Sequence, residues 1–364
     1  MATAANQYQP DYAVPPGWVL AERLEAQGIS HAEFARRCGR SPKLISEIIA
    51  GKAPIEPVTA LQFERVLGVN ARIWIGIESD YRLHQALEAE TKKAAESAAW
   101  AKRFPISELV KRKIIPKPAS SADKVSTLLA FFGVGSVEAW QSRHNKERVA
   151  YRHSPSFRSN EWVLATWLRL GELEAEQAEC ADYSESAFKR ALVRIRELTA
   201  IPIDEALSET RRLCLEAGVV LTVTKPLPKL ALSGTTRWLT PRKALIQLSA
   251  RHLTCDHLWF SFFHEAAHIL LHSKRGIFVQ GGKGKLTDAD AEADRWASDF
   301  LLPRHHWDRF IRGTSFDESG VVQFAANQRI DPGIVVGRLQ HEGQLPWSQL
   351  NHLKSRLQWG EDAG

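Results

Sequence analysis

Residues 256–271 read DHLWFSFFHEAAHILL, an apolar run without glycine or proline that contains the pattern H-E-x-x-H at 264–268. The absence of helix breakers predicts a buried helix over this run. On a helix, His264 and His268 stand one turn apart, so both imidazoles can face a single metal ion. This spacing, with Glu265 between the two ligands, predicts a zinc hydrolase centre.

Two histidines do not complete a catalytic zinc site, which usually takes three protein ligands and keeps a fourth position open. We expect the third donor on a second helix, because residues 288–302 are rich in alanine and acidic side chains and end before Pro303. Glu292 is our first choice, since its longer side chain spans an inter-helix gap of about 8–10 Å more easily than an aspartate does. Asp290 is the second choice.

Glu265 is expected to act as general base, taking a proton from the attacking water and passing it to the leaving amine. His272 continues the i+4 series, but successive i+4 steps drift around the helix, so we expect it to support the site rather than bind the ion. Two alternatives remain open: the pattern stands by chance on an ordinary amphipathic helix, or the metal is bound without turnover.

Three segments upstream of this helix have the alternating, β-branched character of strands: residues 218–224, 233–239 and 244–249. We expect residues 240–243 to form the turn of a hairpin between the last two. A sheet edge beside the metal could hold an extended peptide by strand addition. Arg237 is the basic residue on this hairpin that could bind a carbonyl or carboxylate of a substrate. The alternative for Arg237 is a solvated strand residue.

These strands, followed by WFSFFHEAAHILLH at 259–272, EAD at 292–294 and FLLP at 300–303, resemble the ImmA/IrrE family of zinc metallopeptidases over roughly residues 150–345. The resemblance implies an α+β, zincin-like domain in which a small twisted sheet packs against the active-site helix. It implies His264, His268 and Glu292 as Zn²⁺ ligands and Glu265 as base. It also implies that the domain cleaves a regulatory protein such as a DNA-binding repressor.

Residues 29–51 read ISHAEFARRCGRSPKLISEIIAG, a pattern typical of two short helices joined by a tight turn. Gly39 supplies the turn, and the small Ala35 allows the two helices to approach closely. The expected core residues between the helices are Phe34, Ile45 and Ile48. The pattern therefore predicts a helix-turn-helix, the alternative being a helical hairpin that merely packs.

The expected ends of these helices agree with this prediction. Ser30 and Ser41 have the residue type and position of N-caps, the first in a capping box with Glu33, and Gly51 ends the second helix. We expect the second helix to enter the major groove of double-stranded operator DNA and the basic residues beside it to meet phosphates. The predicted DNA-binding residues are Arg36, Arg37, Arg40, Ser41, Lys43, Ser46 and Glu47.

Residues 17–90, including GKAPI at 51–55 and NARIWI at 70–75, resemble the HigA-type antitoxin branch of the Cro/CI-like, or XRE, DNA-binding domains. This resemblance implies an all-α domain that binds an operator. We expect it to act as a homodimer.

The rest of the chain divides by composition. We predict a disordered tail at 1–16, a basic helical connector at 91–150, the metallopeptidase-like domain at 151–345 and a C-terminal helical tail at 346–364. Within the domain, residues 324–343 again have the pattern of helix, turn and helix but lack a basic turn. We interpret this second pair as a packing or partner surface.

The overall charge is +6 and the sequence pI is about 9.1, which favours DNA binding only weakly. Four scattered cysteines form no C-x-x-C pair, and neither a signal peptide nor an apolar run of transmembrane length is evident, so we expect a cytoplasmic protein away from membranes. The sequence thus predicts a multidomain regulator or antitoxin with a zinc-dependent endopeptidase domain acting on a repressor or toxin partner. The alternative is a non-proteolytic antitoxin whose metallopeptidase-like fold senses metal or binds a protein.

Overall fold

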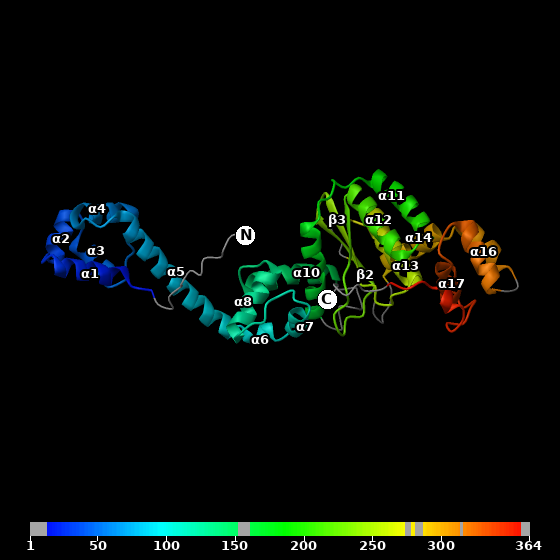
Figure 1. Ribbon diagram of the computed structural model, residues 1–364, viewed down its shortest axis with the longest axis horizontal. Coiled ribbons are helices and arrows are strands. Elements are labelled where there is room, and N and C mark those ends of the chain that lie inside the picture. Colours follow the sequence, from blue (N-terminus) through cyan, green and yellow to red (C-terminus); the bar gives the residue numbers. More distant parts are fainter. Residues whose placement is uncertain (1–12, 152–160, 274–277, 281–286, 314–315, 358–364) are drawn as a thin grey trace. The chain divides into compact units, whose positions relative to one another are not determined.

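The computed structural model describes residues 13–151, 161–273, 278–280, 287–313 and 316–357 (Figure 1). The chain forms two compact units, residues 1–98 with 120–123, and residues 99–119 with 124–364. None of the helices in the described ranges is both long and apolar enough to cross a membrane. The expected tail at 1–16 lies outside the described residues up to residue 12, and its last residue, Pro16, already begins a helix.

The first unit is built from helices. They are α1 (Pro16–Ala26), α2 (His31–Cys38), α3 (Pro42–Ile49), α4 (Pro57–Leu67) and α5 (Ala71–Glu96). Its core contains the three predicted apolar residues Phe34, Ile45 and Ile48, all fully buried, together with Phe63 and Trp74. The ring of Phe63 contacts both Phe34 and Trp74. The predicted wedge between α2 and α3 is therefore confirmed.

Local chemistry sets the ends of α2 and α3 as expected. The Ser30 hydroxyl accepts a hydrogen bond from the Glu33 amide, and the Ser41 hydroxyl accepts one from the Leu44 amide. Gly39 follows α2 with a φ of 64°, a left-handed conformation that glycine adopts without strain. One detail differs: the Glu33 carboxylate bonds to Arg36 and Arg37 instead of closing a capping box with Ser30.

The second unit begins with four helices in the region that we expected to form only a connector, followed by one helix in the predicted metallopeptidase-like domain. They are α6 (Ala98–Ala101), α7 (Ile106–Lys111), α8 (Ser121–Phe132), α9 (Val137–Tyr151) and α10 (Glu161–Gln177). Buried aromatic rings hold them together: Phe104 contacts Trp100, Phe132, Trp140 and Trp162 within 5.2 Å between ring centroids. Most of residues 99–150 therefore belongs to a packed unit, because their aromatic side chains bury one another.

A four-stranded mixed sheet, in the order β1-β3-β2-β4, forms the centre of the second unit. The strands are β1 (Val219–Val223), β2 (Gly234–Thr240), β3 (Lys243–Leu248) and β4 (Phe278–Gln280). Strand β3 pairs in parallel with β1 and antiparallel with β2, which in turn pairs antiparallel with β4. The three predicted strands and the hairpin at 240–243 are confirmed.

Helices cover the sheet. The helix α13 (Cys255–Leu271) contacts β2 and β3, while α10 contacts β1 and β3. The second unit also contains α11 (Glu185–Leu198) and α12 (Ile203–Glu216), and the latter packs on β1. On the α10 side, the buried Gln247 amide donates to the carbonyl of Trp167 at 2.7 Å. The predicted helix at 256–271 is therefore present and buried.

The C-terminal part surrounds α13. It comprises α14 (Asp288–Leu301), α15 (Arg304–Ile311), α16 (Glu318–Gln328), α17 (Pro332–His341) and a short 3-10 helix, η2 (Asn351–Leu353). Glycines allow α17 to approach α13, because there is no space for a larger side chain at two positions of α17. A Cβ atom at Gly337 would lie 2.6 Å from Asp256 Oδ2, and a Cβ atom at Gly333 would lie 2.5 Å from Cys255 Sγ. The pair α16 and α17 thus packs inside the unit, as expected for residues 324–343.

The expected C-terminal helical tail differs from the structure. Only residues 351–353 are helical in the described part of 346–364, and Arg356 instead forms a β-bridge with Thr254. Pro346 and the nearby polar residues Ser348, Gln349 and Asn351 favour turns over a regular helix. Residues 358–364 lie outside the described residues.

Candidate functional site

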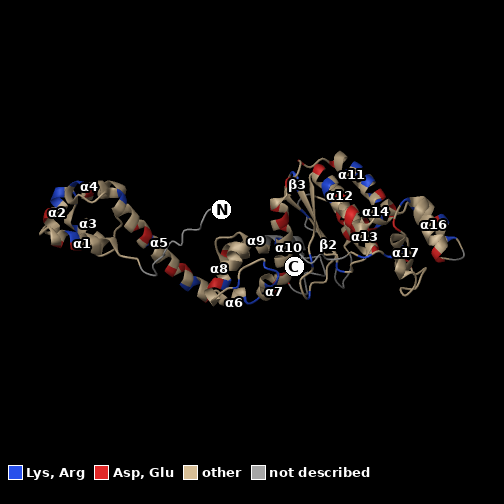
Figure 2. Ribbon diagram, viewed as in Figure 1, with Lys and Arg blue, Asp and Glu red and all other residues tan. Residues whose placement is uncertain are grey.

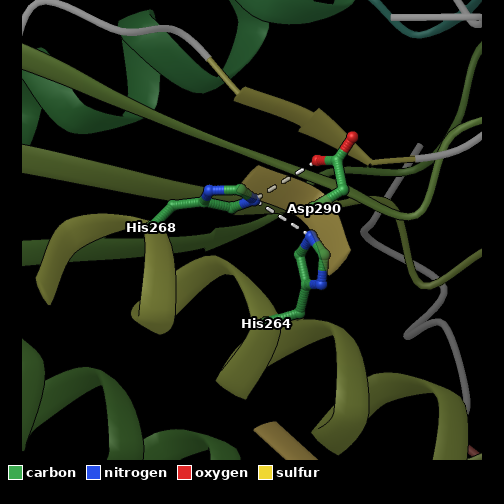
Figure 3. Close-up of side chains that lie close together, drawn as sticks. All are labelled: His264, His268 and Asp290. Atoms are coloured by element: carbon green, nitrogen blue, oxygen red, sulfur yellow. Dashed lines mark hydrogen bonds and ion pairs between the residues drawn. The ribbon is translucent and has the colours of Figure 1, made fainter. Parts of the chain in front are cut away.

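The H-E-x-x-H pattern lies in the C-terminal half of α13, a helix that packs against α14. His264, Glu265 and His268 are each at most 1% exposed, and the Nε2 atoms of the two histidines lie 3.0 Å apart. Figure 3 shows a third side chain directed at this pair, that of Asp290 from α14. Its Oδ1 atom lies 3.6 Å from His268 Nε2, and the three residues form a group whose ligand atoms could hold a metal ion.

Asp290, rather than Glu292, is the carboxylate that lies at the histidine pair. The side chain of Glu292 is half exposed, and its Oε2 atom lies 3.3 Å from His272 Nε2. The reason is helical phase, which outweighs the length of the side chain: residue 292 is two positions beyond 290, about 200° around the helix axis. The structure therefore brings Asp290, our second choice of third ligand, to the histidine pair and places Glu292, our first choice, outside this group.

A capping box fixes the rotation of α14. The Thr287 hydroxyl accepts from the Asp290 amide, and Asp290 Oδ2 accepts from the Thr287 amide and hydroxyl at 3.2 and 2.7 Å. This arrangement engages one carboxylate oxygen and directs the other, Oδ1, toward His268. The first turn of α14 thus positions the acidic donor.

Asp294, one turn after Asp290, was not identified from the sequence as a site residue. Its Oδ1 atom lies 2.7 Å from His264 Nδ1, which leaves Nε2 of the same ring facing His268. Carboxylates commonly orient metal-binding histidines through the second ring nitrogen in this way. The i, i+4 spacing of Asp290 and Asp294, with Ala293 and Ala297 buried beside them, is the signal that could have identified it.

The environment sets the protonation of the two imidazoles differently. Burial lowers the pKa of His268 to about 2, and the neighbouring charges of His264 and His272 act in the same direction. For His264, burial also opposes protonation, but the hydrogen bond to Asp294 and the charge of Glu265 raise the pKa above its usual value. His272 lies beside His268, with 2.9 Å between their Nδ1 atoms, as expected for a supporting residue.

Glu265 is fully buried, and neither carboxylate oxygen has a hydrogen-bond partner within the described residues. Burial raises its pKa to about 7. Gly234 at the start of β2 makes room for it, since a Cβ there would lie 2.8 Å from Glu265 Oε1. An unpaired buried carboxylate is costly, so this position is typical of a functional group rather than a structural one.

Arg237 lies away from this group. Thr236 donates from its hydroxyl to the Glu265 carbonyl at 2.9 Å, so the alternation along β2 directs Arg237 to the opposite face of the sheet. There Arg237 is 4% exposed, and it donates to Glu172 at 2.8 Å and to the Leu168 carbonyl of α10. Arg237 therefore lies away from the histidine pair and is not solvated. It is a buried structural residue.

The donor set suits zinc. Two imidazole nitrogens and a carboxylate oxygen are a ligand combination found in catalytic zinc sites. Ligand nitrogens about 2.0–2.1 Å from one tetrahedral ion are separated by little more than 3 Å, close to the observed separation of the Nε2 atoms. The acidic residues of α14, whose ribbon segments are red in Figure 2, provide negative charge beside the histidines. The residues present therefore fit a divalent metal ion.

The first unit presents the surface expected to meet DNA. At the N-terminal end of α3, Ser41, Lys43 and Ser46 are exposed, and the side chain of Lys43 is 83% exposed. Glu47 is partly exposed, with its Oε1 atom 3.8 Å from Lys43 Nζ. A Cβ on Gly17 would lie 2.4 Å from the Ile49 carbonyl, so this glycine lets α1 pack against the end of α3. The predicted residues of α3 thus share one accessible end of the helix.

The basic residues around the turn are less free than we expected. Arg36 and Arg37 are exposed but both pair with Glu33, and Arg40 donates from Nε to Gln62 at 2.6 Å. The ribbon of α2 in Figure 2 accordingly carries both basic and acidic residues. Exposed ion pairs are weak, so a phosphate can compete for these arginines.

Solved structures similar to this chain include two antitoxins. The HigA-family addiction module antidote protein of Coxiella burnetii is 25% identical, with 23% of this chain and 91% of that chain covered and a TM-score of 0.22. Pseudomonas aeruginosa antitoxin HigA, solved with the higBA promoter, is 28% identical, with 22% and 90% covered and a TM-score of 0.22. The Pseudomonas aeruginosa protein PA4674, solved with its operator DNA, is 28% identical, with 21% and 85% covered and a TM-score of 0.21.

The family model described as "Helix-turn-helix" matches residues 20–74. The HTH-type transcriptional regulator YddM of Escherichia coli K12 is 30% identical over 71 residues, 20% of this chain and 76% of that protein. Virulence-associated protein I of Dichelobacter nodosus is 33% identical over 75 residues, 20% of this chain and 69% of that protein. Through this N-terminal segment the chain belongs to the helix-turn-helix family.

Proposed function

We propose that this protein is a DNA-binding transcriptional regulator of the HigA-like antitoxin type whose second unit carries a metal centre. The observation that supports the regulatory function is the exposed N-terminal end of α3, in a segment that matches the helix-turn-helix family. In this motif the second helix places the side chains near its N-terminus against base edges in the major groove. Ser41, Lys43 and Ser46 are the residues that would make these contacts.

The test is binding to the DNA upstream of the gene, measured by fluorescence anisotropy over a range of salt concentrations. Lys43→Ala should weaken binding and reduce its dependence on salt, because one cation that faces the DNA is lost. Lys189→Ala is the matched control, an exposed lysine of the second unit that likewise pairs with a glutamate. Equal binding by wild type and Lys43→Ala would contradict this assignment.

A homodimer is the assembly that we propose for DNA binding. Val58, Leu61 and Ile73 on α4 and α5 are 48–59% exposed, so these apolar side chains are available to contact a second copy of the chain. A two-fold symmetric protein would match a palindromic operator. Leu61→Glu should lower the molar mass measured by sedimentation equilibrium from dimer to monomer. Val193→Glu, at an equally exposed position of the second unit, should leave it unchanged.

For the second unit we propose a zinc-dependent endopeptidase function directed at a regulatory protein, a repressor or a toxin. The supporting observation is Glu265, whose buried carboxylate has no hydrogen-bond partner among the described residues and lies beside the histidine pair. His264, His268 and Asp290 would hold the metal. When bound, the metal would supply Lewis acidity toward a peptide carbonyl.

The chain's own residues would then divide the remaining work. Glu265 would hold a proton at its carboxylate and transfer it to the leaving amine, for which a pKa of about 7 is well matched at neutral pH. Asp294 would keep the His264 ring in the orientation that presents Nε2. Gly234 would keep space around the Glu265 carboxylate.

The competing function is a metal-dependent sensing or protein-binding module without turnover. Wild type and Glu265→Gln distinguish the two, assayed for zinc content and for cleavage of the repressor or toxin encoded next to the gene. Cleavage by wild type, with zinc retained but cleavage lost in Glu265→Gln, supports the peptidase. Absence of cleavage by the zinc-loaded wild type with every neighbouring partner would favour the module.

A further inference from the structure

A cavity lies beside the N-terminal half of α13, about one turn before the histidine pair. It measures about 120 Å³ and is enclosed by α13, α14 and α17. Its apolar walls are the side chains of Phe260, Leu301, Leu302 and Ile334. Trp347 also lines the cavity while leaving 60% of its own surface exposed, so the cavity reaches the surface.

The size of this cavity indicates a small occupant. An engineered apolar cavity of about 150 Å³ in another protein holds a benzene ring, so the observed volume suits a single ring or a short branched chain. The lining is mainly apolar with a few polar groups, the combination typical of small-molecule sites.

Charge in the cavity is already balanced. Asp256 pairs with Lys354 at 2.6 Å, both 7% exposed as side chains, and Arg338 pairs with Glu342 at 2.8 Å. The guanidinium of Arg338 also donates to the carbonyls of Ser298 and Leu302. An ionic ligand would therefore disturb existing pairs, so the cavity favours a neutral molecule.

One side chain of the lining, Asp256, has a polar atom without a partner among the described residues. Its Oδ2 atom binds Lys354, whereas Oδ1 is buried and has no hydrogen-bond partner there. Leaving a buried carboxylate oxygen unpaired costs free energy, which a hydrogen-bond donor in the cavity would recover once the carboxylate turns toward it. The complementary ligand is thus apolar over most of its surface and carries one hydroxyl or amide N–H.

We propose that this cavity binds a small neutral molecule of this class, with its apolar body against Phe260 and Ile334 and its donor on Asp256. Such a ligand would contact the two helices that carry the metal-binding group. Phe260 precedes His264 by one turn of α13, with 6.4 Å between the ring centroids, and Ser298 follows Asp294 by one turn of α14.

The experiment is a fluorine NMR titration of the full-length protein with 4-fluorophenol and with 4-fluorotoluene, two probes of nearly equal size. Both should bind saturably, and the phenol should bind about three to ten times more tightly because only it can donate to Asp256. Equal affinities would overturn the proposed ligand class. A failure of both probes to saturate below their solubility would overturn the site itself.

Two variants localise the binding. Ser298→Leu places a larger side chain in the cavity from the surface of α14 and should abolish binding of both probes. Asp299→Leu adds the same side chain at the next, exposed position outside the cavity lining and should leave binding unchanged. Equal binding by the two variants would overturn the assignment. Because the readout is ligand binding, the result does not depend on whether the metal centre hydrolyses peptides.

Discussion

Replacing Asp290 by alanine should affect both stability and metal binding, because its two carboxylate oxygens have different partners. Oδ2 closes the capping box with Thr287, and Oδ1 faces His268. Loss of an N-terminal capping interaction costs about 1 kcal/mol in the free energy of unfolding. Removing a group that only supports a metal ligand lowers metal affinity by about 10–100-fold. Asp290→Ala removes a proposed ligand itself, so it should lower zinc affinity by at least about 100-fold, or about 2.7 kcal/mol.

Two matched variants separate these effects. Thr287→Ala removes the cap and keeps the carboxylate, so it should lower the stability of the metal-free protein by about 1 kcal/mol and the zinc affinity by about 10-fold, less than the loss in Asp290→Ala. Glu292→Ala should change neither quantity appreciably, since that side chain is half exposed and its partner is His272. Urea unfolding measures the stability, and competition with a chromophoric chelator measures the zinc affinity. A larger loss of zinc affinity in Glu292→Ala than in Asp290→Ala would refute the proposed ligand set.

Three further predictions concern packing and charge in the second unit. Gly337→Ala should destabilise the protein by about 1–3 kcal/mol, seen as a lower midpoint in thermal unfolding, because the new Cβ would meet Asp256 at 2.6 Å; an unchanged midpoint would contradict the close packing of α17. Gly234→Ala should displace the Glu265 carboxylate and abolish any peptidase activity while zinc content is retained, and a fully active variant would show that the space is not needed. Burial opposes ionisation of Glu172, but Arg237, Arg143 and Arg169 outweigh it and lower its pKa in the folded protein. Its stabilising contribution is therefore present above its unfolded pKa of about 4.3 and is lost as the pH falls through the lower folded value. The stability difference between wild type and Glu172→Gln should shrink over that acidic range in urea titrations, and a constant difference would refute the effect.

Features encoded within a few residues of the chain could be predicted from the sequence. The spacing of His264 and His268 on an unbroken apolar run located the buried helix and the histidine pair. The serines, Gly39 and the apolar residues at 29–51 located both helices of the helix-turn-helix and their ends. These signals are local, since caps, turns and helical periodicity depend on neighbours within one or two turns.

Features that depend on tertiary packing could not be predicted in the same way. The choice between Asp290 and Glu292 depends on where Thr287 starts α14 and hence on the phase of that helix. The burial of Arg237 depends on Glu172, a residue 65 positions upstream in α10. The aromatic packing around Phe104 likewise joins side chains of α6, α8 and α9, whose sequence resembled a basic connector, to a side chain of α10.

The most direct test of the metal centre is an anomalous difference map from crystals of the zinc-loaded protein, recorded at the zinc absorption edge. We predict one peak about 2.0–2.2 Å from His264 Nε2, His268 Nε2 and Asp290 Oδ1. A peak whose carboxylate ligand is Glu292, or the absence of a peak at the histidine pair in fully zinc-loaded crystals, would contradict the proposal.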